Sequence, residues 1–230
     1  MLIAREIGLS SGDCVVDIGC GRGYFIIAAA RLAGQVVGVD LMNGFSRPTW
    51  WFHFNRAMEL LGLSHKVQGV RADACRTPFR DSCFNVATAA HCIRNFRSTN
   101  DIIGAIREMK RIVRNNGYVV IVENLPEARN KLQEAHLKLH SIRVKLLRDE
   151  LDYFSKEELL KIINRVGFKD VQVKIINYNL CATPTLFYVD AKKLHGEAKD
   201  SMLEEYERTI QFVRKHGEAS TPVIIIKARK

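Results

Sequence analysis

A short apolar run that ends in a cluster of glycines constrains this chain more than any other segment. The run Cys14–Ile18 leads into Gly19, Gly21 and Gly23, and apolar residues then recur at helical spacing over Tyr24–Leu32. A strand that passes through glycines into a helix lets the backbone approach a ligand closely at the positive helix N-terminus. The sequence therefore predicts an α/β domain with a ligand-binding loop.

The spacing of the glycines narrows the class of ligand. A dinucleotide fingerprint needs G-x-G-x-x-G, and its third glycine would fall on Tyr24. The loop instead reads G-x-G-x-G, and Asp17 stands two residues before its first glycine. An acidic side chain there suits a ligand with a cationic ammonium group better than a pyrophosphate.

Strand and helix patterns alternate over the first 125 residues, which is typical of a parallel sheet with helices on both faces. Further strands are predicted at 35–41, 67–70, 84–89 and 118–122, and helices at 50–61 and 101–113. After residue 125 the pattern predicts a basic amphipathic helix that starts at Asn124 and Pro126, helices at 155–167 and 197–216, and strands at 171–178 and 223–228. No linker or repeat divides residues 1–230, so we expect one domain.

Two more acids follow predicted strands. Asp40 closes the second strand, and Asp73 follows the third. Because open α/β sheets bind ligands at the carboxyl ends of their strands, Asp17, Asp40 and Asp73 are expected to meet at one site. Each acid taken alone could equally be a helix cap or a turn residue.

The segments Val15–Tyr24, Val36–Leu41, Val70–Pro78, Phe84–Phe96 and Arg111–Val122 resemble, in that order, the motifs of class I S-adenosylmethionine-dependent methyltransferases. The resemblance implies a Rossmann-like, seven-stranded and mostly parallel sheet whose last strand is antiparallel. It also implies S-adenosylmethionine as cofactor, with Asp17 and Gly19 at its methionine end, Asp40 on the ribose, and Asp73 with Ala74 beside the adenine. The residues expected to bind the cofactor are Asp17, Gly19, Cys20, Gly21, Gly23, Asp40, Leu41, Asp73, Ala74 and Ala90.

The segment after the fourth strand is expected to lie between the methyl group and the acceptor. His91 is the candidate general base, because its unperturbed pKa lies near neutrality, although it could simply pack beside the cofactor. Arg94 and Asn95 are similar to the arginine–asparagine pair of ubiquinone/menaquinone-type C-methyltransferases, which suggests a small aromatic or isoprenoid acceptor. The candidate substrate residues are Tyr24, Trp50, Trp51, Cys92, Arg94 and Asn95.

Several segments could cover an acceptor. Residues 43–54 carry an aromatic cluster that could instead be core packing, and residues 181–193 are a second candidate. The helical segment at about 126–150 reads as an insertion after the fifth strand and a possible lid. A neighbouring subunit could also close the pocket, so a homo-oligomer is compatible with the sequence.

The chain is basic, with 35 Lys and Arg against 25 Asp and Glu and a formal charge of +10. This charge suits a nucleic acid, an anionic small molecule or a membrane surface, but it is equally expected of a solvated basic exterior. The expected acceptor is a small anionic or aromatic molecule, and an RNA or protein methyltransferase is the alternative. Residues 1–125 hold 15 Lys and Arg against 10 Asp and Glu, so half of the excess lies in each part and no basic arm stands out. A cofactor-binding partner subunit without catalysis is a further alternative.

The cysteines and the apolar runs indicate the compartment. The 6 cysteines form no C-x-x-C pair and no spaced Cys/His quartet, so we expect free thiols and no metal site. Cys20, Cys75 and Cys92 all follow predicted strands, which keeps a thiolate site for a metalloid open as an alternative. The apolar runs fall short of the ~20 residues that a membrane span needs, so a cytoplasmic protein is expected.

Overall fold

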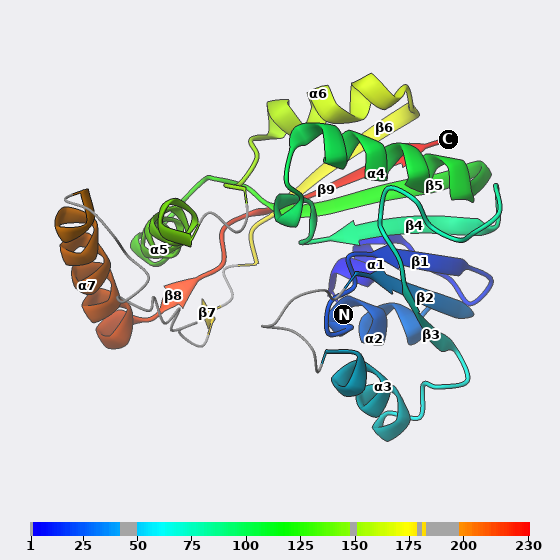
Figure 1. Ribbon diagram of the computed structural model, residues 1–230, viewed down its shortest axis with the longest axis horizontal. Coiled ribbons are helices and arrows are strands. Elements are labelled where there is room, and N and C mark those ends of the chain that lie inside the picture. Colours follow the sequence, from blue (N-terminus) through cyan, green and yellow to red (C-terminus); the bar gives the residue numbers. More distant parts are fainter. Residues whose placement is uncertain (1, 42–49, 148–150, 179–180, 183–197) are drawn as a thin grey trace.

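The computed structural model describes residues 2–41, 50–147, 151–178, 181–182 and 198–230. Its centre is a seven-stranded sheet with the strand order β3-β2-β1-β4-β5-β9-β6 (Figure 1). The strands are β1 (Cys14–Ile18), β2 (Gln35–Asp40), β3 (Val67–Arg71), β4 (Phe84–Ala90), β5 (Val113–Asn124), β6 (Lys169–Ile176) and β9 (Val223–Arg229). The pairs among β1 to β5 are parallel, and β9 runs antiparallel to both of its neighbours. This arrangement confirms the predicted fold class.

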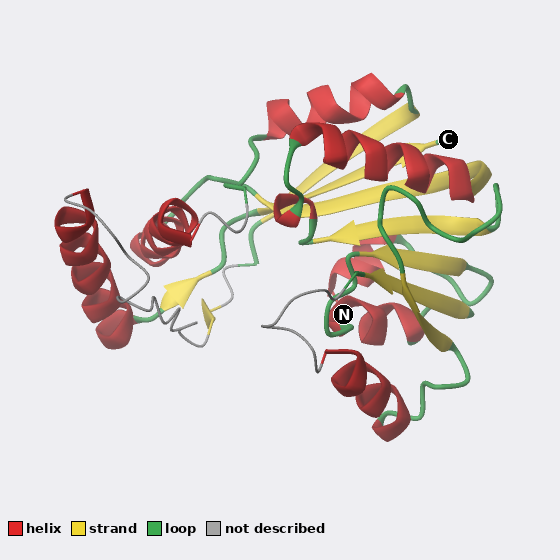
Figure 2. Ribbon diagram, in the orientation of Figure 1, coloured by secondary structure: helices red, strands yellow, loops and turns green. Residues whose placement is uncertain are grey.

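Helices cover both faces of the sheet (Figure 2). The helices α1 (Leu2–Ile7), α2 (Tyr24–Ala30) and α3 (Trp50–Leu60) contribute to the apolar core of one face. The helices α4 (Thr99–Ile112) and α6 (Lys156–Val166) contribute to the core of the other. Since both faces are buried, successive apolar residues of a strand serve opposite cores: Ile224 and Ile226 pack towards α4 and α6, and Val223 and Ile225 pack on the other side.

The remaining elements lie beyond the carboxyl ends of the parallel strands (Figure 1). They are α5 (Lys131–Leu147), α7 (Ala198–His216) and a small antiparallel pair of β7 (Cys181–Ala182) and β8 (Glu218–Ala219). Leu139 of α5 and Val213 of α7 belong to a separate small apolar core. No helix among the residues described is both long and apolar enough to cross a bilayer.

Two boundaries differ from the sequence prediction by five residues or more. The helix predicted to start at Asn124 and Pro126 begins at Lys131, because Asn130 caps it: the Asn130 side-chain oxygen accepts from the N–H groups of Leu132 and Gln133. The strand predicted to begin at Tyr118 begins at Val113.

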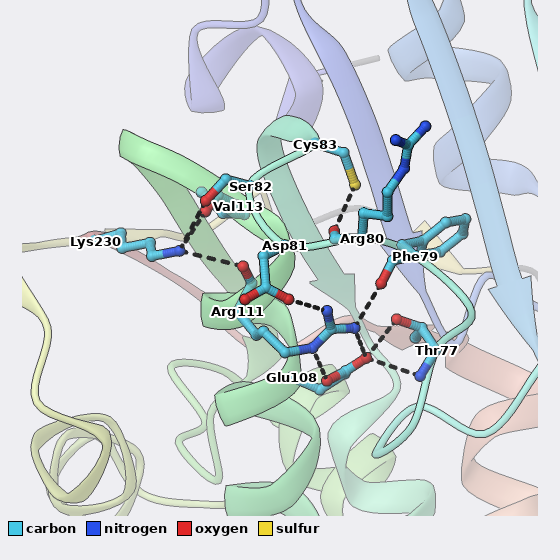
Figure 3. A network of polar contacts seen from close by, with 10 residues as sticks. All are labelled: Thr77, Phe79, Arg80, Asp81, Ser82, Cys83, Glu108, Arg111, Val113 and Lys230. Atoms are coloured by element: carbon cyan, nitrogen blue, oxygen red, sulfur yellow. Dashed lines mark hydrogen bonds and ion pairs between the residues drawn. The ribbon is translucent and has the colours of Figure 1, made fainter.

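The connection between β3 and β4, residues 72–83, contains no helix and is held instead by a network around Arg111 of α4 (Figure 3). The guanidinium of Arg111 donates to both carboxylate oxygens of Glu108 at 2.7 and 2.8 Å, to Asp81 and to the carbonyl of Phe79. Glu108 in turn accepts from the main-chain N–H of Thr77 at 2.8 Å. These contacts lower the pKa of Glu108 to about 2, with Arg111 as the largest cause, and they fix the loop that carries Asp73.

Candidate functional site

A cleft of about 1390 Å³ opens at the carboxyl ends of the parallel strands. Nine of the ten residues predicted to bind the cofactor line it: Asp17, Gly19, Cys20, Gly21, Asp40, Leu41, Asp73, Ala74 and Ala90. Gly23 does not line it. Of the candidate acceptor residues, Tyr24, His91, Cys92, Arg94 and Asn95 line the same cleft, whereas the side chains of Trp50 and Trp51, and residues 43–49 and 183–193, lie outside what the structure describes.

The glycines shape the floor of the cleft through their backbone conformation. Gly19 has φ +71°, and a Cβ there would lie 2.6 Å from the Cβ of Cys92. Gly23 has φ +84° and caps α2, and a Cβ there would lie 2.8 Å from the ring of Phe54. The N–H groups of Gly19 and Cys20 both donate to the carbonyl of Val39. The loop is therefore tied to β2 in a form that glycine alone adopts without strain.

Asp17 lies at the base of the loop and is almost completely buried. The hydroxyl of Thr88 on β4 donates to its Oδ1 at 2.7 Å. Burial raises the pKa of Asp17 to about 8, the Thr88 hydrogen bond opposes that rise, and Asp40 adds to it. An isolated buried carboxyl of this kind is neutral near pH 7, and a cation brought next to it would ionise it.

Asp40 and Asp73 hold their own loops while lining the cleft. Asp40 Oδ2 accepts from the N–H of Gly21 at 2.8 Å, so the end of β2 is joined to the glycine loop. Asp73 Oδ1 accepts from the N–H of Cys75 at 2.8 Å, which closes a short turn. Each of these two acids therefore stabilises its own loop, which was the alternative that the sequence allowed, and each also lines the cleft.

The cysteines near the cleft are thiols rather than thiolates. Cys92 is buried, and its Sγ donates to the carbonyl of Ile18 at 3.0 Å. Burial raises the pKa of Cys20 and Cys92 well above the usual range and that of Cys75 to about 11. No group of three or more metal-binding side chains occurs in the described part of the chain.

His91 follows β4 with φ +54°, a left-handed conformation that its N–H holds by donating to the carbonyl of Val122 at 2.8 Å. Such strain in a non-glycine residue is concentrated at functional sites. Burial and then the charge of Arg94 lower the pKa of His91 to about 4, although its side chain is 34% exposed. The imidazole is therefore neutral at neutral pH, able to accept a proton but a weaker base than free imidazole.

One buried group that bonds the His91–Arg94 segment, without lining the cleft itself, was not predicted from the sequence. Glu123, at the carboxyl end of β5, is 1% exposed. Its Oε1 accepts from the N–H of Ile93 at 2.9 Å, and its Oε2 accepts from Nη1 of Arg94 at 3.2 Å. The Nδ1 of His91 lies 4.0 Å from the same Oε2. The sequence did contain a signal for Glu123, because this carboxylate directly follows the apolar run Val119–Val122, and a charge in a buried strand needs bonding partners.

Other lining side chains come from elements distant in sequence. Leu2 and Ile3 of α1, Arg22 of the glycine loop, and Phe96 and Arg97 after the 3-10 turn Ile93–Asn95 all line the cleft, as do Arg143 of α5 and Tyr178 after β6. The cleft is therefore lined by four aspartates, counting Asp101, and also by arginines and aromatic rings.

Comparisons with known proteins agree with this geometry. Residues 16–121 match a family model described as a methyltransferase domain. The chain is 26% identical over 188 residues to a demethylmenaquinone methyltransferase of Bacteroides fragilis, with 74% of each chain covered. It is 22% identical over 190 residues to a demethylmenaquinone methyltransferase of Staphylococcus saprophyticus, covering 75% of this chain and 77% of that protein.

Solved structures show the same fold. One is a crystal structure described as a putative methyltransferase from Bacillus halodurans, with a TM-score of 0.65 at 18% identity over 100% of this chain and 97% of that one.

Proposed function

Because this chain is a class I S-adenosylmethionine-dependent methyltransferase, we propose that it methylates a ring carbon of a small quinone-type acceptor in its reduced, hydroquinone form. The observation that carries the proposal is the single cleft that joins the aspartate-lined glycine loop to the His91–Arg94 segment. The small-molecule acceptor agrees with the relatives, which are named for a quinone.

The residues of the loop fit the cofactor. Gly19 leaves room where a Cβ would strike Cys92, and the buried carboxyl of Asp17 suits a ligand ammonium group. We assign Asp40 to the ribose hydroxyls, and Asp73 with Ala74 to the adenine edge. When bound, S-adenosylmethionine supplies a methyl group already activated on a sulfonium, so the protein's task is alignment and proton transfer.

Methylation of a hydroquinone ring needs a proton acceptor and a cation, and His91 and Arg94 can supply them. A hydroquinone ring carbon becomes a strong nucleophile when a neighbouring hydroxyl loses its proton. Neutral His91 can accept that proton, and the guanidinium of Arg94 can stabilise the oxyanion that remains. The new carbon–methyl bond forms as the sulfonium–methyl bond breaks, and the ring then loses its hydrogen as a proton.

The remaining lining groups support a small aromatic acceptor. Tyr24, Phe96 and Tyr178 offer apolar faces, and Arg97 and Arg143 add positive charge that suits an anionic ring oxygen. Arg143 comes from α5, so this helix is our candidate for the lid over the acceptor.

The test is turnover of a chemically reduced, short-chain demethylmenaquinone with S-adenosylmethionine, followed by mass spectrometry. The expected product is heavier by one methylene unit and does not form with the unreduced quinone. Bulk RNA and a protein extract serve as competing acceptors. Methylation of either of these, with no methylation of the hydroquinone, would overturn the proposal.

A further inference from the structure

We propose that Glu123 is a positioning residue, whose buried carboxylate holds the guanidinium of Arg94 against the ring of Tyr153 at the acceptor end of the cleft. The assignment deepens the proposed function, since it concerns the arginine that faces the acceptor there. Glu123 itself does not line the cleft and therefore acts through Arg94 and the turn that carries it.

Glu123 contacts both the backbone of that turn and the side chain of Arg94. One oxygen accepts from the N–H of Ile93 at 2.9 Å, which fixes the start of the 3-10 turn. The other accepts from Nη1 of Arg94 at 3.2 Å, which fixes the side chain. A carboxylate that is 1% exposed would be strongly unfavourable without such partners.

A second element holds Arg94 from the opposite direction. The Cζ of Arg94 lies 5.5 Å from the ring centroid of Tyr153, within range of a cation–π contact. The carbonyl of Arg94 accepts from the N–H of Leu151 at 2.6 Å. Both partners belong to the segment that joins α5 to α6, so this segment and β5 together determine where the guanidinium lies.

Tyr153 is itself held firmly. Its ring stacks on His140 of α5 with centroids 3.9 Å apart, and its hydroxyl lies 3.1 Å from Nε2 of His136. The Nδ1 of His136 lies 3.2 Å from Oε2 of Glu218, a fully buried residue of β8. Arg94 is thus the end of a chain of contacts anchored by two buried carboxylates, and its position depends on α5 and β8 as well as on the sheet.

The arrangement implies a pH dependence. Burial raises the pKa of Glu123 to about 7, opposed mainly by the charge of Arg94. The ionisable groups around it are Arg94, His91 and Cys92 after β4, and Tyr153 before α6. Protonation below about pH 7 removes the charge that holds Arg94, so turnover should fall on the acid side of that value.

The main test is Glu123→Gln, which keeps the size of the side chain and removes its charge. We expect kcat for the hydroquinone acceptor to fall on the order of 100-fold, the effect of a catalytic group displaced by about 1 Å, while the affinity for S-adenosylhomocysteine stays within about twofold. The acid limb near pH 7 should vanish from the pH profile of the variant. An unchanged kcat with the acid limb retained would overturn the proposal.

Glu59→Gln is the control, because Glu59 also accepts from an arginine, Arg56 at 3.1 Å, but lies in α3 outside the cleft. It should leave kcat unchanged. If Glu123→Gln does not fold, Tyr153→Leu removes the opposite support of Arg94 and should lower kcat in the same way. Wild-type kcat in Tyr153→Leu would then count against the proposal.

A readout without any acceptor separates this inference from the proposed function. In ¹⁵N-labelled enzyme bound to S-adenosylhomocysteine, the guanidinium of Arg94, identified by its loss in Arg94→Lys, should show separate, slowly exchanging Nη signals. Glu123→Gln should merge them. Merged signals in the wild type would refute the positioning role, whereas absent hydroquinone methylation with separate Nη signals would refute the acceptor assignment alone.

Discussion

Adding one methyl group to the glycine loop tests how the floor of the cleft is built. Gly19→Ala places a Cβ on a residue with φ +71°, 2.6 Å from the Cβ and 2.8 Å from the Sγ of Cys92. A left-handed conformation with a Cβ costs about 1–2 kcal/mol, and forcing an atom into a packed site costs about 1–3 kcal/mol more. We therefore expect the variant to lose about 2–5 kcal/mol of the free energy of unfolding.

Gly62→Ala is the matched control. Gly62 has nearly the same backbone conformation, φ +66°, but nothing lies within 4 Å of a Cβ built there. It should lose about 1–2 kcal/mol, the conformational part alone. The difference between the two variants isolates the contact with Cys92.

Both variants would be measured by urea unfolding and by calorimetric titration with S-adenosylhomocysteine. Gly19→Ala should bind at least about tenfold more weakly, because relief of the clash moves either the loop or Cys92, and both line the cleft. Gly62→Ala should bind like the wild type. Equal losses of stability in the two variants, or wild-type affinity in Gly19→Ala, would refute this account of the loop.

Three further predictions follow from the charges and thiols. The pKa of Asp17 is raised to about 8, and its carboxyl would ionise beside the ammonium group of the ligand. Binding of S-adenosylhomocysteine should therefore release a proton near pH 7 and become tighter as the pH rises towards 8. Calorimetric titrations in buffers of different ionisation enthalpy measure the released proton, and a heat of binding that does not depend on the buffer would contradict the prediction. Glu108 has a pKa lowered from 4.5 to about 2, so it contributes up to about 3 kcal/mol of stability above pH 5 that is lost as the pH falls towards 2; urea unfolding against pH should show this loss in the wild type and a flatter curve in Arg111→Ala. Cys20 and Cys92 should resist a maleimide at pH 7 until denaturant is added, and rapid labelling of either in the folded protein would show that it is not buried as described.

That Asp17, Asp40 and Asp73 line one cleft could be predicted from the sequence, because each acid is local to a strand end. Asp17, Asp40 and Asp73 each stand at or just after a strand, and parallel topology alone brings those ends together. The G-x-G-x-G spacing of the glycines also favoured a ligand with an ammonium group over a dinucleotide.

Only part of the acceptor side could be predicted from the sequence. The expected residues Tyr24, His91, Cys92, Arg94 and Asn95 line the cleft, but the other groups reach it through tertiary packing. Glu123 is one charge at the end of an apolar strand, and its partner Arg94 is 29 residues away. Arg143 and Tyr178 reach the cleft from elements whose placement no local pattern fixes. The six-residue helix α1 also went unpredicted, since it is too short to show a periodicity.

The displaced start of α5 shows two local signals in competition. Pro126 suits the first turn of a helix, but Asn124 is still paired with Val223 in the sheet, and its side chain donates to Thr221. The chain is therefore still extended at that point, and the helix begins only after the next capping residue, Asn130. Similarly, Asn116 takes φ +66° within β5, at an irregular stretch of its pairing with β4, three residues after the helix predicted at 101–113.

The most direct test of the central claim is calorimetric titration of the wild type and Asp40→Ala with S-adenosylhomocysteine. The wild type should bind one molecule per chain. Asp40→Ala should bind about 10- to 150-fold more weakly, the range expected when a charged hydrogen-bond acceptor is lost, because Asp40 both joins the loop at Gly21 and is assigned to the ribose. No binding to the wild type, or equal affinity in the two proteins, would contradict the account.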